Sequence, residues 1–125
     1  MLIEFGAALN LPSEFNGALD TLRAIGRQLW RGDIQEAIRE CRLLLERIGA
    51  ALDDASVPTE TDPFKRSKHE RYLEVRRAIV NLASAAPHGD ATADPIEWHR
   101  SDALAVFAMV SGLLRALEAA DVRAN

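Results

Sequence analysis

Residues 29–52, LWRGDIQEAIRECRLLLERIGAAL, decide the fold of this chain. Gly32 ends one amphipathic helix, and Asp33 stands three residues before Glu36, a capping-box spacing that starts the next helix almost without a loop. The second helix carries apolar residues every three or four positions, at Ile34, Ile38, Cys41, Leu45, Ile48 and Leu52. So short a connection predicts that the two helices are antiparallel neighbours.

One helix is predicted before this turn and another well after it. The first begins near Ser13, and its apolar stripe, which Trp30 widens, is expected at Phe15, Leu19, Leu22, Ile25 and Leu29. The later helix is predicted from Asp62–Pro63, an N-cap followed by proline at the first helical position, to about Ala86. Its inward face is expected at Tyr72, Val75, Ile79, Leu82 and Ala86.

A fourth helix is predicted to begin at Ser101, which we expect to cap it. Its main stripe is expected at Leu104, Phe107, Val110, Leu114 and Leu117. Three further apolar residues lie off that stripe, namely Val106, Met109 and Leu113, so the helix is apolar over a wide arc. It is therefore either central in the bundle or shared with another subunit.

The length of 125 residues fits one domain. Ala and Leu together number 37, against 17 for Val, Ile and Thr, a ratio that favours helix over strand. The sequence thus predicts an all-α protein, an antiparallel four-helix bundle over residues 13–121. Residues 1–12 have no evident place in such a core, and we expect them to form an N-terminal arm.

Composition and charge argue against several classes of protein. The net charge is −4, and the helix after Gly32 is slightly acidic, so we expect no DNA-reading helix-turn-helix. Cys41 is the only cysteine, which excludes an internal disulfide. No apolar stretch reaches about 18 residues, so no membrane span is expected. Residues 1–10 contain Glu4 and lack a basic start, unlike a signal peptide, and the chain is expected to be cytoplasmic.

Short motifs occur in both halves of the chain. In residues 29–38 and 41–46 a helix ending at a Gly-Asp turn is followed by an Ala-Ile pair and a Leu-Glu. The second half contains Asn81-Leu82, Pro87-His88-Gly89-Asp90, Ile96-Glu97-Trp98 and Arg100-Ser101-Asp102-Ala103. Together these motifs resemble HEPN-type domains, small helical bundles of bacterial defence and toxin systems. The resemblance covers roughly residues 13–120 and implies the same bundle layout. The segment of residues 29–46 also resembles a tetratricopeptide hairpin. A tetratricopeptide array needs about three such units, and the sequence contains only one.

The chain departs from the HEPN pattern at its catalytic motif. Active HEPN ribonucleases resemble one another in an arginine followed by four to six residues and a histidine. No arginine precedes His69, His88 or His99 at that distance, and Val80 stands where the family's arginine would fall. We therefore expect that this chain lacks the ribonuclease activity of the HEPN family. The remaining catalytic hypothesis is a metal-independent ribonuclease that uses Arg77 and His88.

A basic cluster marks the start of the third helix. Six of the fifteen Lys and Arg residues lie within residues 65–77. An RNA-binding function would use the phosphate-contacting and stacking side chains Lys65, Arg66, Lys68, Tyr72 and Arg76. The alternative is a solvated helix face with Glu–Arg pairs, which such charge runs usually form.

We expect no metal and no cofactor. His88, Asp90 and His99 offer suitable donor atoms, but their spacing matches no metal signature. Cys41 lies on the inward stripe of its helix and is expected in the core.

The function hypothesis that the sequence favours is a non-catalytic interaction or regulatory domain that pairs as a homodimer or binds a protein partner. Its interface is predicted at Val106, Met109 and Leu113, with Trp98 as an anchor. The alternative is an RNA-binding or RNA-cleaving domain of a bacterial toxin or phage-defence system.

Overall fold

The computed structural model describes residues 17–58, 60–85 and 96–124, with side chains up to residue 117 in the last segment. The described residues form helices and turns and no strand, as the sequence predicts. Four α-helices make the bundle: α2 (Ala18–Arg31), α3 (Ile34–Ala51), α4 (Lys68–Ser84) and α5 (Arg100–Ala124). The predicted N-terminal arm and the loop with His88 and Asp90 lie outside the described residues.

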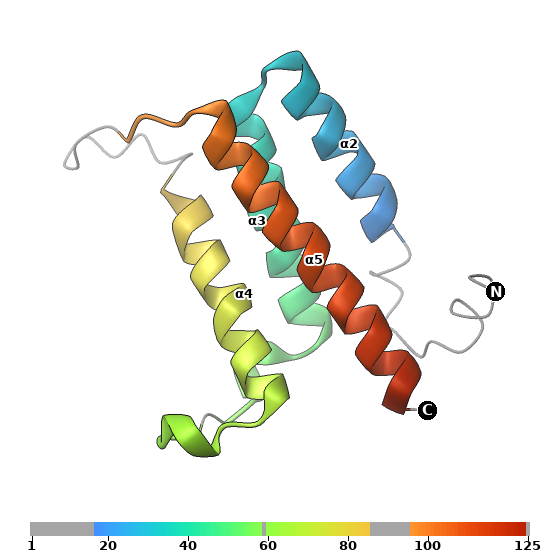
Figure 1. Cartoon of the computed structure of the whole chain (residues 1–125), viewed down its shortest axis with the longest axis vertical. Coiled ribbons are helices and arrows are strands. Elements are labelled where there is room, and N and C mark those ends of the chain that lie inside the picture. The colour runs from blue at the N-terminus through green and yellow to red at the C-terminus, as the bar shows by residue number, and fades with distance from the viewer. Residues whose placement is uncertain (1–16, 59, 86–95, 125) are drawn as a thin grey trace.

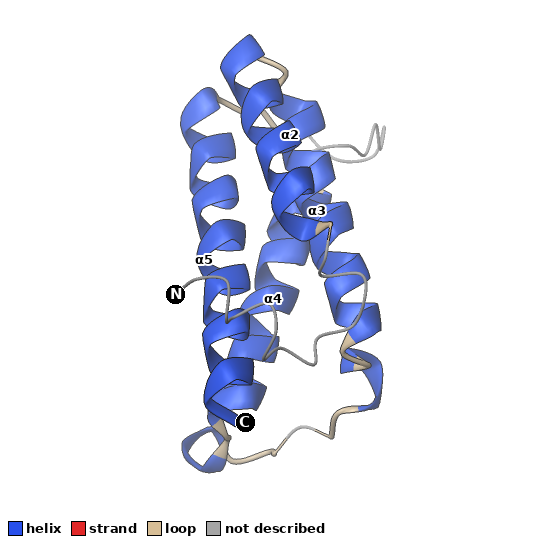
Figure 2. Cartoon of the chain, turned by 90° about the vertical axis from the view of Figure 1, so that its right-hand side faces the viewer, coloured by secondary structure: helices blue, strands red, loops and turns tan. Residues whose placement is uncertain are grey.

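Successive helices run in opposite directions, up and down the bundle (Figures 1 and 2). Helices α3 and α5 each pack against all three others, whereas α2 and α4 lie at opposite edges. Because α5 is covered from three sides, much of its surface is needed for the core of a single chain.

The core is aliphatic, and α3 contributes most to it. Its predicted stripe is confirmed: Ile38, Cys41, Leu45 and Ile48 are buried, with Ile34 and Leu52 packed against the cluster. Burial raises the pKa of the Cys41 thiol to about 12, so this cysteine behaves as a small apolar core residue.

The turn between α2 and α3 depends on Gly32, which has a φ of 87°. Its amide donates to the carbonyl of Leu29, and the amide of Asp33 donates to the carbonyl of Gln28, which satisfies the end of α2. The predicted capping box is wrong, because the Asp33 side chain makes no capping hydrogen bond. The tight antiparallel connection itself is confirmed.

Helix α4 starts later than the Asp62–Pro63 pair predicts. That pair begins a short 3-10 turn, η3 (Pro63–Lys65), where the Asp62 side chain accepts from the amide of Phe64. The α-helix begins at Lys68, behind a capping box in which Ser67 and Glu70 each accept from the other's backbone amide. Pro63 therefore occupies the first position of the 3-10 turn and not of the α-helix.

The predicted inward face of α4 is wrong at two positions. Val75 and Leu82 are 44% and 46% exposed, while the buried positions are Leu73, Arg76, Ile79 and Ala83. Helix α4 is thus rotated relative to the prediction, and its buried face includes an arginine, described below.

The ends of α2 and α5 also differ from the expectations. Trp30 does not widen the core stripe but is 81% exposed, with the guanidinium of Arg100 5.5 Å from its ring centroid. Ser101 lies inside α5, and the start of that helix is closed by Asp102, whose carboxylate accepts from the amide of His99 at 2.9 Å.

Replacing Gly32 with alanine tests the turn. A side chain at this positive φ is strained, so the Gly32→Ala variant is expected to lose about 1 kcal/mol of unfolding free energy. The Gly32→Asn variant is the matched control, because asparagine tolerates the left-handed region and should lose less. Equal losses for both variants in urea denaturation would contradict this account of the turn.

Candidate interaction surface

Several arginines of the predicted basic cluster, residues 65–77, make contacts within the chain. Arg66 donates to the carbonyl of Glu60 at 2.8 Å and pairs with Glu74. Arg71 donates to the carbonyls of Arg66 and Pro63, both at 3.1 Å. These side chains hold the connection between α3 and α4 in place and are therefore less available for phosphate groups.

Arg76 is a correction to the predicted nucleic-acid site. Its side chain is 3% exposed and forms a bidentate pair with Asp54, with Nε–Oδ2 at 3.1 Å and Nη2–Oδ1 at 2.7 Å. Asp54 lies in the 3-10 turn η2 (Asp54–Ser56), which follows α3. A Cβ on Gly49 would stand 3.0 Å from the Asp54 carboxylate, so glycine lets the turn fold back on α3.

Arg77 has no described catalytic partner. Its Nη2 donates to the carbonyl of Asp54 at 3.1 Å, which makes it a second clamp on the same turn. His88 lies outside the described residues, so the predicted pairing of Arg77 with His88 stays a prediction.

Removing Arg76 is expected to lower the free energy of unfolding substantially. The Arg76→Ala variant leaves the Asp54 carboxylate buried without its cation, which costs about 3 kcal/mol of unfolding free energy. Arg23→Ala is the matched control, because Arg23 pairs with Asp20 on the exposed face of α2 and should contribute less than about 1 kcal/mol. Similar losses for the two variants would contradict a structural role of the buried pair.

Glu70 makes the stability of the connection between α3 and α4 depend on pH. The backbone amides of Glu60 and Ser67 donate to its carboxylate at 2.7 and 3.1 Å and hold its pKa below the ordinary value of 4.5. A carboxylate with a lowered folded-state pKa stabilises the fold above the unfolded-state pKa. That stabilisation is lost as the pH falls through the folded-state value.

The Glu70→Gln variant tests this linkage. It should be less stable than the wild type at neutral pH, and the difference should shrink as the pH falls below about 4.5, where the wild-type carboxylate takes up its proton. Urea denaturation across this pH range measures both free energies of unfolding. A difference that stays constant into acid would contradict the assignment.

The predicted interface on the fourth helix needs correction at two positions. Val106 and Leu113 are 1% and 6% exposed, so they belong to the core of the single chain. Trp98 is partly buried against the same core, and its indole Nε1 has no hydrogen-bond partner among the described residues. Of the predicted set Met109 is the most exposed, at 39%. The wide apolar arc of α5 is mostly explained by its central place in the bundle.

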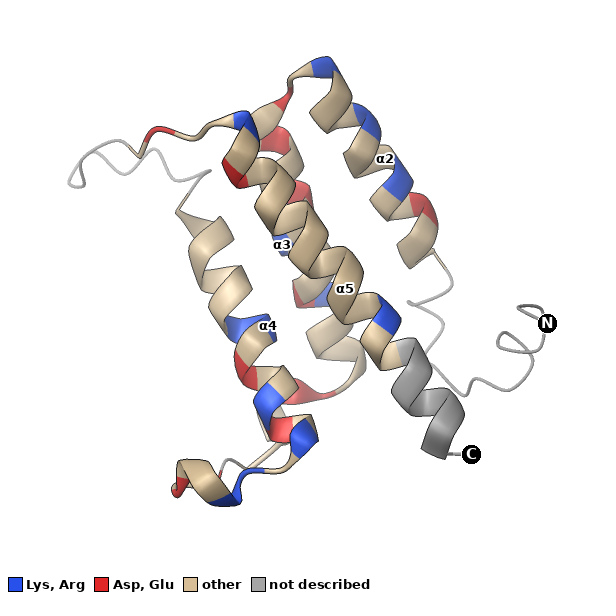
Figure 3. Cartoon of the chain, in the orientation of Figure 1, with Lys and Arg blue, Asp and Glu red and all other residues tan. Residues whose placement is uncertain are grey.

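The outer side of α5 is nevertheless apolar. Between Ala103 and Leu114 its exposed residues follow helical spacing, and we call them the neutral face: Leu104, Ala105, Ala108, Met109 and Gly112. No charged residue occurs between Ala103 and Leu114. Figure 3 shows this uncharged stretch along α5, together with the uncharged upper half of α4. The sequence already shows this feature, because residues 103–114 include no charged side chain.

Two exposed residues of α4 lie along the seam with α5. Tyr72 of α4 and Ala116 of α5 line the same hollow, which marks the sides on which these helices meet. Val75 and Leu82 share the Tyr72 side of α4 at helical spacing, as Met109 shares the Ala116 side of α5. The neutral face therefore continues toward α4.

The hollow itself lies between the first turns of α4 and the later turns of α5. It has a volume of about 240 Å³, and we call it the α4–α5 hollow; its lining residues are Lys68, His69, Tyr72, Ala116 and Leu117. It contains two residues of the predicted nucleic-acid set, Lys68 and Tyr72. The structure thus separates those two from the arginines of that set.

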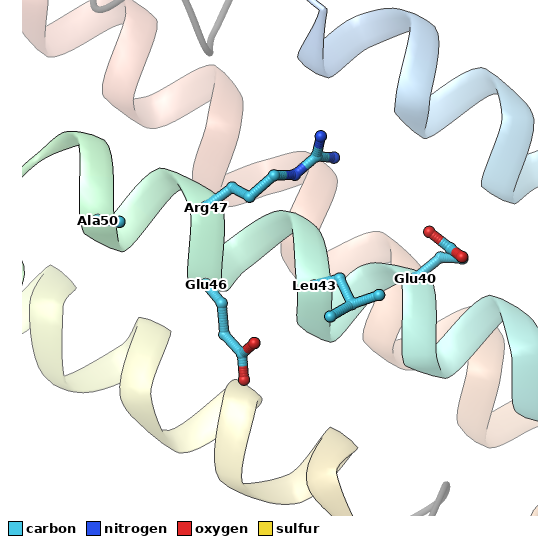
Figure 4. Close-up of a pocket in the computed structure, with 5 residues that line it drawn as sticks. All are labelled: Glu40, Leu43, Glu46, Arg47 and Ala50. Atoms are coloured by element: carbon cyan, nitrogen blue, oxygen red, sulfur yellow. The ribbon is translucent and has the colours of Figure 1, made fainter.

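A second hollow lies on the outward face of α3, and its described lining comes from that helix. Its lining residues are Glu40, Leu43, Glu46, Arg47 and Ala50 (Figure 4). Glu46 points to one side of α3 and Glu40 and Arg47 to the other, so the two carboxylates do not share a reacting centre. Glu46 is moreover paired with Arg42 at 3.2 Å.

Within the described part of the chain, no group of three or more metal-binding side chains comes together. His99 lies between Glu97 and Asp102, with nitrogen–oxygen distances of 3.4 and 3.6 Å. Over the same residues, no helix combines the length and apolar character that crossing a membrane requires.

The fold and this surface define a small all-α four-helix bundle with an uncharged helix face on its outside. Comparisons with known protein families, with curated proteins and with solved structures give no match. The resemblance to HEPN-type domains therefore stays a prediction.

Proposed function

We propose that this chain is a non-catalytic interaction domain that pairs with a second copy of itself through the neutral face of α5. The observation that carries the proposal is the exposure of Leu104 and Met109, at 46% and 39%, on a helix side without charges. Covering these half-exposed side chains would contribute about 1 kcal/mol for each residue in each copy.

A second copy suits this face better than a charged partner does. In a two-fold pair the same surface meets itself, so any charge near the axis would face its own kind. The neutral face holds none. Ala105, Ala108 and Gly112 also have small side chains, which allow the backbones of two helices to approach closely.

The RNA hypothesis has less support. Phosphate contacts need accessible cations, and Arg66, Arg71 and Arg76 are engaged within the chain. Lys65, Lys68 and Tyr72 remain as candidates for it. An RNA function would show itself as binding that weakens steeply with salt.

A charge placed in the neutral face should disperse the pair. Ala108→Glu sets two carboxylates against each other near the proposed axis and is expected to raise the dimer dissociation constant at least about tenfold. Ala50→Glu, the same change on the exposed face of α3, should leave it unchanged. Sedimentation equilibrium measures both constants.

Two outcomes would contradict the proposal. A wild-type chain that stays monomeric at high concentration has no such pairing. Equal weakening by Ala108→Glu and Ala50→Glu would place the contact elsewhere. Circular dichroism of each variant confirms that the helices are intact.

A further inference from the structure

The α4–α5 hollow has an apolar body. Tyr72 and Leu117 are partly buried and pack against the core cluster, and Ala116 leaves space beside them. Its volume is about 240 Å³. That volume suits a small ligand of about ten non-hydrogen atoms and not a macromolecule.

The described lining of the hollow carries one ammonium group and no carboxylate. That group belongs to Lys68, the first residue of α4, and none of the ion pairs between described residues involves it. The acidic side chains nearby on α4 interact with other groups: Glu70 accepts from the Ser67 amide, and Glu74 pairs with Arg66. The start of α4 adds the positive end of a helix dipole.

We propose that the α4–α5 hollow binds a small organic anion with an apolar body, such as a medium-chain carboxylate. The carboxylate is placed at Lys68 and the hydrocarbon body against Tyr72 and Leu117. Both halves are needed, because an exposed ion pair alone contributes little and the apolar contact alone gives no orientation. For a ligand of this size the expected dissociation constant is on the order of 1 mM.

Titration of the full chain with octanoate tests the proposal, with backbone amide NMR shifts as the readout. We expect saturable shifts at residues 68–72 and 116–117. Octanamide has the same body without the charge, and acetate has the charge without the body; each should bind at least about tenfold more weakly. Equal binding of octanamide, or octanoate shifts confined to the neutral face, would overturn the proposal.

Two variants separate the site from a general attraction of anions. Lys68→Gln should weaken octanoate binding at least about fivefold, whereas Lys65→Gln removes the same charge outside the lining and should leave it unchanged. Ala116→Phe fills the hollow and should abolish binding while both lysines remain. Equal effects of the two lysine variants, or full binding by Ala116→Phe, would overturn the site. Thermal unfolding of each variant shows whether it is folded.

Discussion

The buried pair of Arg76 and Asp54 sets the rotation of α4, and the accessible surface follows from it. An arginine whose side chain is 3% exposed must direct its guanidinium to a carboxylate, and that carboxylate lies in the turn after α3. With Arg76 turned inward, Val75 and Leu82 come to lie on the exposed side of α4. The same rotation places Tyr72 beside Ala116 and so forms the α4–α5 hollow.

Helix α5 packs into the core on one side and is uncharged on its exposed side. Because α2, α3 and α4 all pack against it, it supplies core residues such as Val106, Val110 and Leu114. Its remaining side would ordinarily carry charges, yet it is neutral from Leu104 to Gly112. A small bundle has no structural need for an uncharged outer helix face, and a pairing surface gives that face a reason.

Hydrophobic periodicity predicted the bundle and the interior of α3 correctly, since Ile38, Cys41 and Ile48 follow one helical stripe. It failed on α4, where a buried Arg76 replaced the apolar residue that a pattern search assumes. The partner Asp54 is 22 positions away, and no local signal connects the two. On α5 the wide apolar arc was recognised, but only packing shows that Val106 and Leu113 lie inside and Met109 outside.

The most direct test of the pairing account is an isotope-filtered NOE measurement on a mixture of labelled and unlabelled chains. The account predicts contacts between chains from the Met109 methyl group to Ala105 and Ala108 of the other copy. The isotope filter passes only contacts between a labelled and an unlabelled chain, so contacts within one helix do not contribute. Contacts between chains that involve α2 or α3 instead, or none at high concentration, would contradict it.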